Sequence, residues 1–216
     1  MNSDTIVSFD NGLTMRVGPG LFRPGTDTVA LARFAKLRKG MNVVDLGCGC
    51  GAFELLLAPS HPDLRITGIE LNADAARYAA ENVAAAGLDD KVTILHADLR
   101  GCPLPSDSAH VVISNPPYFT TESSSAALTQ PESRMELTCS CAELVHTAAR
   151  LLRTGGRFYV LWRPERLVEL FAALHEADLE PKRMQAARGR RVRFVMIEAM
   201  RGGSPGLIWE DDLILQ

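Results

Sequence analysis

The 216-residue sequence lacks a long apolar run, an excess of basic residues and any internal repeat. No hydrophobic stretch approaches the roughly 18 residues that a membrane-spanning helix needs, so we expect no such helix. The formal net charge is −3, which excludes a general basic coat for nucleic acid but not a local basic face. Residues 1–10 have neither the basic nor the apolar part of a signal peptide, which favours a cytoplasmic protein.

The sequence also lacks the cysteine pattern of a disulfide framework, because its five cysteines are odd in number and follow no signal peptide. Cys48 and Cys50 lie in a glycine-rich turn, and Cys139 and Cys141 form a C-x-C pair. Zinc sites usually place about two to four residues between paired cysteines. We therefore expect reduced thiols and no metal site.

From residue 41 onward, short β-rich runs alternate with helical patterns. The expected strands are 42–46, 65–69, 91–96, 110–114 and 157–162, followed by strand-like stretches at 182–187, 192–200 and 206–215. The expected helices are 52–57, 74–86, 141–152 and 165–177. Such an order predicts an α/β fold with a mostly parallel sheet and helices on both faces. The last strands have no helices between them, so at least one of them is expected to be antiparallel.

Polar residues end the first four expected strands. They are Asp45–Gly51, Glu70, Asp98 and Asn115–Tyr118, and each follows an apolar run. Ligands of open α/β sheets bind outside the carboxyl ends of the strands. We therefore expect these four segments to face one cleft.

The first segment, Asp45–Gly51, reads D-L-G-C-G-C-G between a strand and a helix. Alternate glycines permit unusual backbone angles and let a ligand approach the backbone closely. A nicotinamide-dinucleotide site is the nearest alternative, but it prefers the spacing G-x-G-x-x-G. An aspartate at the strand end suits a cationic group, such as the ammonium of an amino acid, better than a pyrophosphate.

Two further acids complete this pattern. A carboxylate at Glu70 can accept hydrogen bonds from two ribose hydroxyls, and Asp98 can accept one from the exocyclic amine of an adenine. Taken singly, each acid is equally explained as a helix cap or a solvated loop residue. Together with the glycine turn they describe a ligand with a ribose, an adenine and an ammonium, which S-adenosylmethionine fits.

The N-P-P-Y loop, Asn115–Tyr118, is the most specific element of the sequence. Its prolines remove two backbone donors, so the acceptors that remain are the Asn115 side-chain oxygen and the Pro116 carbonyl, next to an aromatic ring. An adenine amine is a poor nucleophile because its lone pair is delocalised into the ring. Two acceptors on its N–H bonds favour the transition state of methyl transfer, in which positive charge develops on the nitrogen.

Together these segments resemble a class I S-adenosylmethionine-dependent methyltransferase that acts on amino groups. Residues 20–32, the R-M-E-L-T stretch at 134–138 and residues 151–158 are similar to the bacterial tRNA(Val) adenine-37 N6-methyltransferase family. The resemblance implies a Rossmann-like sheet of seven strands. The cofactor contacts it implies are Asp45, Gly47, Cys48, Gly49, Gly51, Glu70, Leu71, Asp98, Leu99 and Asn115. The catalytic residues it implies are Asn115, Pro116, Pro117 and Tyr118.

Two basic stretches, 16–39 and 180–194, each contain six basic residues against one acidic residue. Clustered basic residues can position a phosphate backbone, although a solvated surface explains them as well. With a tRNA substrate, the target adenine would be splayed out and held against aromatic rings. The expected substrate contacts are Tyr118, Phe119, Arg188, Arg190 and Arg191.

Three functions therefore remain open at this point. The first is methylation of an amino group in a nucleic acid, expected to be N6 of an adenine in tRNA, with another RNA or DNA as the alternative. The second is methylation of a glutamine amide in a protein, which N-P-P-Y loops also serve. The third is a methyltransferase fold that only binds its ligand. We expect one domain over residues 1–216, with an N-terminal substrate segment at 1–40 and a Rossmann-like core at 41–216.

Overall fold

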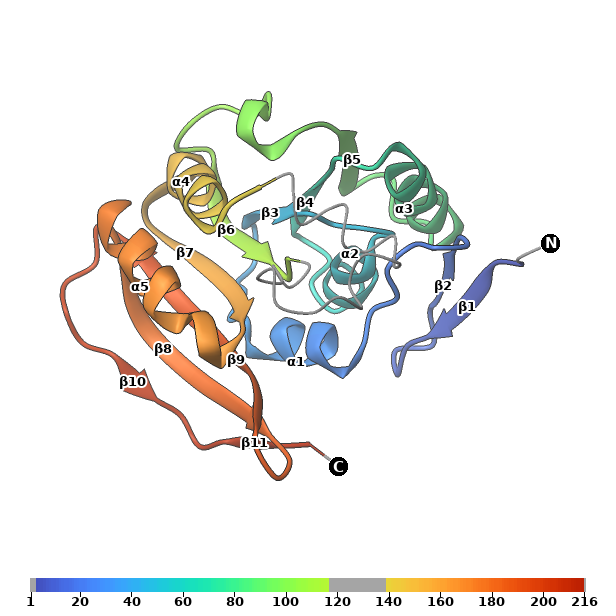
Figure 1. The fold of residues 1–216 in the computed structure, drawn as a ribbon. Helices are drawn as coiled ribbons and strands as arrows, with labels where there is room; N and C mark the ends of the chain where they lie inside the picture. The colour runs from blue at the N-terminus through green and yellow to red at the C-terminus, as the bar shows by residue number, and fades with distance from the viewer. Residues whose placement is uncertain (1–2, 117–138, 216) are drawn as a thin grey trace.

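A computed structural model describes residues 3–116 and 139–215, and Figure 1 shows its central sheet between two groups of helices. The strands are β1 (Thr5–Ser8), β2 (Thr14–Val17), β3 (Asn42–Leu46), β4 (Arg65–Glu70), β5 (Val92–His96), β6 (Ala109–Ser114), β7 (Leu152–Trp162), β8 (Leu179–Arg188), β9 (Val192–Arg201), β10 (Ile208–Trp209) and β11 (Leu213–Ile214). The helices are α1 (Thr26–Phe34), α2 (Ala52–Leu57), α3 (Ala73–Ala85), α4 (Cys141–Leu151) and α5 (Leu167–Glu176).

The large sheet has the strand order β10-β8-β9-β7-β6-β3-β4-β5, with β11 beside β8. Within the described residues, β9 runs antiparallel to both β7 and β8, and the other pairs of this sheet are parallel. The expected α/β class and the antiparallel strand near the C-terminus are confirmed. The carboxyl ends of β3 to β8 consequently lie at one edge of the sheet, where ligands of such sheets bind.

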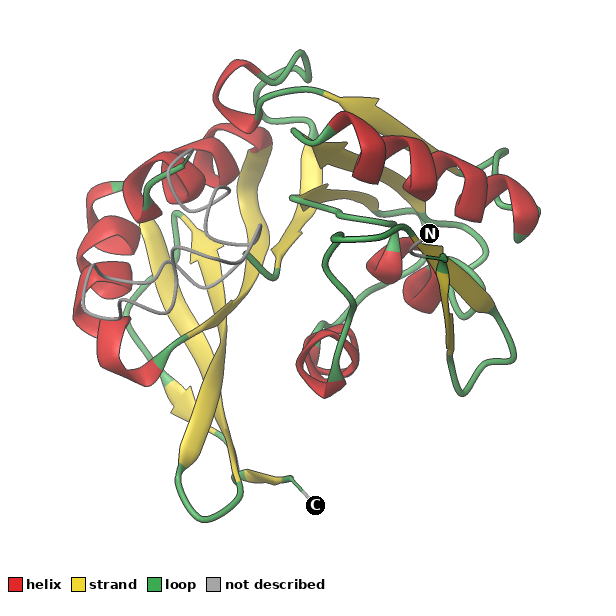
Figure 2. Cartoon of the chain, turned by 45° about the vertical axis from the view of Figure 1, so that its right-hand side comes forward, coloured by secondary structure: helices red, strands yellow, loops and turns green. Residues whose placement is uncertain are grey.

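Side chains of β3 alternate between two hydrophobic cores, as the period of a strand requires. Val43 packs in the core covered by α1, α2 and α3. Its neighbours Val44 and Leu46 belong to a second core, which α4 and α5 cover. Figure 2 shows these two groups of helices on opposite sides of the strands. The expectation of helices on both faces is confirmed.

Local signals explain where two helices begin. The Asn72 side chain accepts hydrogen bonds from the backbone N–H groups of Asp74 and Ala75, which caps α3. Ser140 and Glu143 form a reciprocal capping box at the start of α4. Such caps satisfy N–H groups that the helix itself leaves without partners.

The N-terminal segment contains structure that the sequence did not predict. Strands β1 and β2 form a separate antiparallel hairpin, and the Asn82 side chain on α3 bonds to the backbone N–H and carbonyl of Arg16. The hydroxyl of Tyr78, also on α3, donates to Asp4 over 2.7 Å. The hairpin is therefore fastened to α3 by side chains far away in the sequence.

Several expected bounds differ from those of the structure, and three differences concern the C-terminal half. The helix expected over 141–152 ends at Leu151, and the chain enters β7 at once, so Gly155 and Gly156 lie inside a strand. The helix expected over 165–177 starts with a 3-10 turn and becomes α-helical at Leu167. The stretch 206–215 adds two strands of two residues each, so the sheet has nine strands where seven were expected.

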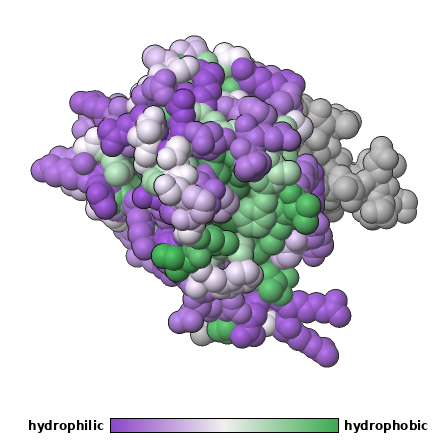
Figure 3. Space-filling model, turned by 90° about the vertical axis from the view of Figure 1, so that its left-hand side faces the viewer, coloured by the Kyte–Doolittle hydropathy of each residue, from purple (hydrophilic) through white to green (hydrophobic). Residues whose placement is uncertain are grey.

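The outer face of the C-terminal strands carries apolar side chains. Leu207, Ile208, Trp209 and Ile214 are all exposed, and Figure 3 shows hydrophobic side chains gathered on the side of the molecule where α5 and β10 lie. None of the described helices has both the length and the apolar character needed to cross a membrane.

Arg183 of β8 joins α1 to the C-terminal strands. Its guanidinium donates to Glu198 over 2.8 Å, to Glu210 over 2.9 Å and to the Phe34 carbonyl over 2.6 Å. The same group lies 4.1 Å from the centre of the Phe34 ring. Because Arg183 and Glu198 are both buried, loss of either partner would leave a charge away from water.

We expect Arg183→Met to lower the free energy of unfolding by about 3 kcal/mol, since Glu198 would remain buried with one partner fewer. Arg157 also pairs with Glu198, over 3.0 Å, which limits the loss. The matched control is Arg188→Met, which removes a half-exposed pair with Asp212 and should cost less than about 1 kcal/mol. Denaturant unfolding measures both variants, and equal losses would contradict the role given to Arg183.

Candidate active site

The glycine turn after β3 has the backbone that its sequence predicts. Gly47, Gly49 and Gly51 have φ values of 80°, 55° and 91°, in the left-handed region. A Cβ atom placed on Gly47 or Gly49 would meet nothing within 4 Å, so open space faces the turn. The N–H groups of Gly47 and Cys48 both donate to the Ile69 carbonyl. The turn is therefore fastened to β4 and leaves room for a ligand beside its backbone.

Glu70 ends β4 and organises this turn. One of its carboxylate oxygens accepts from the Gly49 N–H over 2.9 Å, and the other accepts from the Asn72 N–H over 2.8 Å. The side chain is buried, so it lies beneath the turn rather than in solvent. Each oxygen has a second lone pair for a further donor, which leaves the expected ribose contact chemically feasible.

Asp45 lies on β3 just before the turn, with both carboxyl oxygens buried and without a hydrogen-bond partner among the described residues. Sequence reasoning missed a second such acid, Glu54 of α2, which is buried and unpartnered in the same way. Burial, followed by the charges of Glu54 and Glu70, raises the pKa of Asp45 well above its usual range. The sequence did contain a signal for Glu54, because it is a glutamate within the otherwise apolar helix A-F-E-L-L-L.

Asp98 follows β5 and is more exposed to solvent than the other acids at this edge of the sheet, Asp45, Glu54 and Glu70. Its carboxylate caps a short 3-10 helix by accepting from the Arg100 N–H, and it also pairs with the Arg100 side chain over 3.0 Å. These hydrogen bonds lower the pKa of Asp98. The carboxylate is therefore charged but shared, so an adenine amine would bind beside Arg100 rather than to a free acid.

Asn115 follows β6, and its side-chain amide is held by a residue of the N-terminal segment. Its Nδ2 donates to the hydroxyl of Thr28 over 3.1 Å. Thr28 lies on α1 and is buried; sequence reasoning did not assign it a role. Because this hydrogen bond fixes which way the amide faces, Oδ1, which accepts no hydrogen bond from the described residues, is left as an acceptor.

The structure brings most of the expected cofactor residues to one edge of the sheet. The turn, Glu70, Asp98 and Asn115 follow four neighbouring parallel strands. Leu71 is exposed, Leu99 is half-buried and Cys48 is buried. Pro117, Tyr118, Phe119 and residues 134–138 lie outside the described residues.

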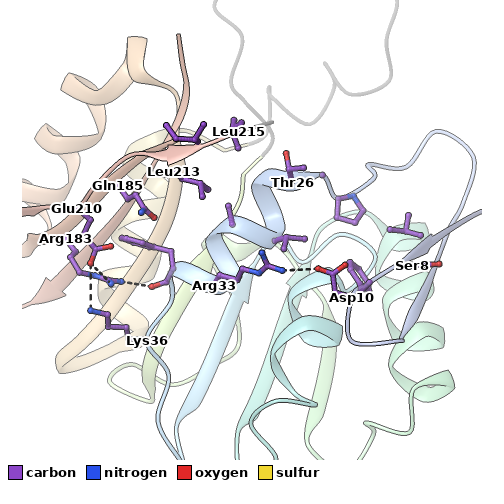
Figure 4. Close-up of a pocket in the computed structure, with 18 residues that line it drawn as sticks. Ser8, Asp10, Thr26, Arg33, Lys36, Arg183, Gln185, Glu210, Leu213 and Leu215 are labelled. Atoms are coloured by element: carbon purple, nitrogen blue, oxygen red, sulfur yellow. Dashed lines mark hydrogen bonds and ion pairs between the residues drawn. The ribbon is translucent and has the colours of Figure 1, made fainter. Parts of the chain in front are cut away.

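Ion pairs neutralise much of the first basic stretch, residues 16–39. The pairs are Arg16 with Asp4 and Glu81, Arg33 with Asp10, Lys36 with Glu210, and Lys39 with Asp63. Figure 4 shows two of these cations in a groove of about 670 Å³ that crosses the outer side of α1. Since acids face the cations there, the groove is not an open site for phosphates.

The second basic stretch, residues 180–194, includes the hairpin between β8 and β9, where three arginines are not neutralised by ion pairs among the described residues. Trp162 at the end of β7 pairs with Val195 of β9, and β8 and β9 extend beyond the end of β7. The hairpin tip thus projects from the carboxyl edge of the sheet. Arg190, Arg191 and Arg193 form no ion pair within the described residues, and they line a hollow of about 530 Å³. Arg188 pairs with Asp212 over 2.6 Å.

Comparison with known proteins decides the family. The family model described as "Methyltransferase small domain" matches residues 22–177, which includes the glycine turn and the loop after β6. The chain belongs to this methyltransferase family. The resemblance found in the sequence is confirmed at this level.

Curated relatives are named more specifically. The tRNA1(Val) (adenine(37)-N6)-methyltransferase of Dickeya chrysanthemi is 34% identical over 186 residues, which are 83% of this chain and 73% of the relative. The protein of the same name from a Flavobacteriaceae bacterium is 34% identical over 143 residues, 65% of this chain and 59% of the relative. The methyltransferase chain thus spans less than two thirds of the second relative.

Solved structures share the fold at low sequence identity. A predicted O-methyltransferase of Agrobacterium tumefaciens superposes with a TM-score of 0.72 at 20% identity, covering 88% of both chains. Geranyl diphosphate methyltransferase in complex with SAM gives 0.62 at 14% identity, covering 82% of this chain and 84% of the other. At this identity the likeness shows the methyltransferase fold alone.

We expect Glu70→Ala to lower the affinity for S-adenosylmethionine at least about tenfold, because hydrogen bonds to a charged group contribute about 1.5–3 kcal/mol each. Two backbone N–H groups would also lose their acceptor, and the turn would loosen. Calorimetry measures the affinity. Glu81→Ala on α3 is the control, because that side chain pairs only at the surface and should leave affinity within about twofold. Unchanged affinity in folded Glu70→Ala would contradict this role.

Proposed function

We propose that this methyltransferase transfers a methyl group from S-adenosylmethionine to N6 of an adenine in tRNA. The observation that carries the proposal is the held amide of Asn115, at the same sheet edge as the glycine turn. The names of the curated relatives support adenine N6 as the target atom and tRNA as the substrate. A tRNA substrate also agrees with the expected cytoplasmic location.

The residues present fit S-adenosylmethionine. Open space faces Gly47 and Gly49, and the unpartnered oxygens of Asp45 lie buried next to the turn. Asp45 and residues 47–51 would hold the amino acid part, Glu70 and Leu71 the ribose, and Asp98 and Leu99 the adenine. When bound, this cofactor supplies an electrophilic methyl group on a sulfonium.

The loop after β6 prepares the accepting nitrogen. Asn115 Oδ1 and the Pro116 carbonyl would accept the two N–H bonds of the adenine amine. Thr28 keeps the amide from rotating, because its hydroxyl accepts from Nδ2. The acceptors interact more strongly as positive charge grows on the nitrogen, so they stabilise the transition state more than the bound substrate. Tyr118 and Phe119 would stack on the adenine, as expected from the sequence.

The arginines of the β8–β9 hairpin would hold the tRNA backbone. Arg190 and Arg191 project from the same edge as Asn115 and have no acidic partner in the described residues. Cations of this kind position a nucleic acid without reading its sequence. Arg188 would contribute less than expected, because Asp212 already holds it.

A labelled-methyl assay tests the function. The purified protein is incubated with labelled S-adenosylmethionine and either bulk tRNA or release factors, and tRNA nucleosides are then analysed by mass spectrometry. We expect label in tRNA and a new N6-methyladenosine peak. Label in the release factors alone would instead support methylation of a glutamine amide. No label in either, from folded protein that binds the cofactor, would refute both activities.

We expect Asn115→Ala to lower methyl transfer at least about a hundredfold, the usual effect of losing one transition-state hydrogen bond. Its affinity for S-adenosylmethionine should stay within about tenfold, because the glycine turn and Glu70 are unchanged. Single-turnover rates and calorimetry measure the two effects. Thr28→Val should lower the rate less, since it frees the amide to rotate without removing it. Activity of Asn115→Ala within a few-fold of the parent would refute this role.

We expect the double variant Arg190→Ala, Arg191→Ala to weaken tRNA binding about tenfold and to flatten its dependence on salt, because two phosphate contacts are lost. Cofactor affinity should not change. The matched control is Arg65→Ala, Lys91→Ala, at the amino ends of β4 and β5 and so at the opposite edge of the sheet. Equal weakening by both double variants would show a general charge effect and contradict a site at the hairpin.

A further inference from the structure

Glu54 is a buried acid that the proposed transfer does not use. It is the only charged residue of α2, whose other residues are apolar. Neither of its carboxyl oxygens has a hydrogen-bond partner among the described residues, and the side chain is fully buried. A buried, unpartnered charge is very unfavourable. Glu54 therefore lowers the stability of the folded protein, whereas its apolar neighbours in α2 do not.

Gly68 shows where the Glu54 carboxyl lies. A Cβ atom placed on Gly68 would be 2.6 Å from Glu54 Oε1 and 2.8 Å from the sulfur of Cys48. Gly68 pairs with Asp45 on the neighbouring parallel strand, and laterally paired residues point to the same face of a sheet. Glu54 therefore occupies the space that a side chain at position 68 would fill, next to Asp45 and beneath the glycine turn.

The groups that face this pair are acidic or neutral. Glu70 from the end of β4 is a third acid, with two backbone donors of its own. Burial raises the pKa of the Cys48 thiol, which stays uncharged. Strand β5 contributes the apolar Ile94 beside Gly68, and α3 contributes Ala79 beside Gly51.

Among the residues that the structure describes, no cation therefore offsets the two carboxyls. Burial, followed by the charge of Glu70, raises the pKa of Glu54 from its usual value to about 7. The pKa of Asp45 is raised in the same direction, first by burial and then by the charges of Glu54 and Glu70. Without a bound ligand, the carboxyls of Asp45 and Glu54 consequently keep a proton at pH values at which exposed carboxyls have lost theirs.

We propose that Asp45 and Glu54 form a proton-holding pair that matches the charge of the bound cofactor and so distinguishes the methyl donor from its product. This inference rests on the proposed cofactor. The donor carries a sulfonium, whereas the product S-adenosylhomocysteine has a neutral thioether. When the donor binds, one O–H bond of the pair breaks and the proton passes to water. When the charge is gone after transfer, the pair takes a proton back.

The pair thus ties cofactor exchange to protonation. A second carboxylate is formed only when a positive charge is present to balance it, so the site favours the donor more as pH rises. Both ligands carry the ammonium of the amino acid part, which balances one carboxylate. The product lacks the sulfonium, so it binds while the pair still holds its proton. Glu54 acts here through Asp45 and is a positioning residue, because it lies beneath the turn rather than beside the ligand.

Calorimetry with both ligands tests the pair. S-adenosylmethionine and S-adenosylhomocysteine are titrated in two buffers of different ionisation enthalpy, at about pH 6 and about pH 8. For the parent protein, we expect the donor to release more protons than the product. Its affinity relative to the product should rise about tenfold between these pH values.

In Glu54→Gln, we expect the difference in proton release to disappear and the affinity ratio to change less than about twofold. Glu81→Gln on the exposed side of α3 is the matched control and should behave like the parent. Equal proton release for both ligands in the parent, or an unchanged difference in Glu54→Gln, overturns the pair while the proposed function stands. Failure of both ligands to bind overturns the proposed cofactor and this inference together.

A second measurement uses the protein without ligand. Because the pKa of Glu54 is raised in the folded state, the unfolded chain loses this proton first, and the parent loses stability as pH rises from about 4.5 to about 7. Thermal unfolding should therefore show that the stability of Glu54→Gln relative to the parent increases over this pH range, with little difference at lower pH. Glu54→Leu serves if the glutamine variant does not fold. A gap that stays constant with pH overturns the pair.

Discussion

The two hydrogen bonds that the Glu70 carboxylate accepts are the interaction on which this site depends. They join the Gly49 N–H of the glycine turn to the Asn72 N–H that precedes α3. One buried side chain thus fixes the ends of β3 and β4 relative to the helix that follows. Because the strands around it are parallel, the polar residues after β5 and β6 reach the same edge. A ligand there meets a backbone that is already arranged.

Charge is distributed unevenly around this edge. The acids Asp45, Glu54 and Glu70 lie buried beneath the turn, while every described basic side chain except Arg183 is at least partly exposed. Many of those cations are held by acids, including the one that joins α1 to the C-terminal strands, Arg183. The net charge of −3 is therefore an average over a buried acidic cluster, a paired surface and one exposed basic hairpin tip. Within the described part of the chain, that tip gathers three arginines without ion pairs, which suits a polyanionic substrate.

The alternation of strands and helices was predictable because apolar periodicity and glycine positions are local signals. Helix α2 has the predicted bounds, and α3 differs by one residue at each end. The N-terminal hairpin was not predictable, since its short strands depend on contacts with Asn82 and Tyr78. The start of β7 was misplaced because a glycine pair usually ends a helix, whereas here β6 pairs with the chain on both sides of it.

The sequence by itself determined the family and the order of the polar segments at the carboxyl edge, because a parallel sheet brings successive strand ends to one edge whatever the details of packing. Tertiary structure alone decided which polar groups are occupied. Thr28 meets Asn115 across 87 positions, and Arg33 meets Asp10 across 23. Gly68 made room for Glu54 beside Asp45. Such partners follow from chain crossings that no local pattern encodes, and they decide whether a charge is free, shared or buried.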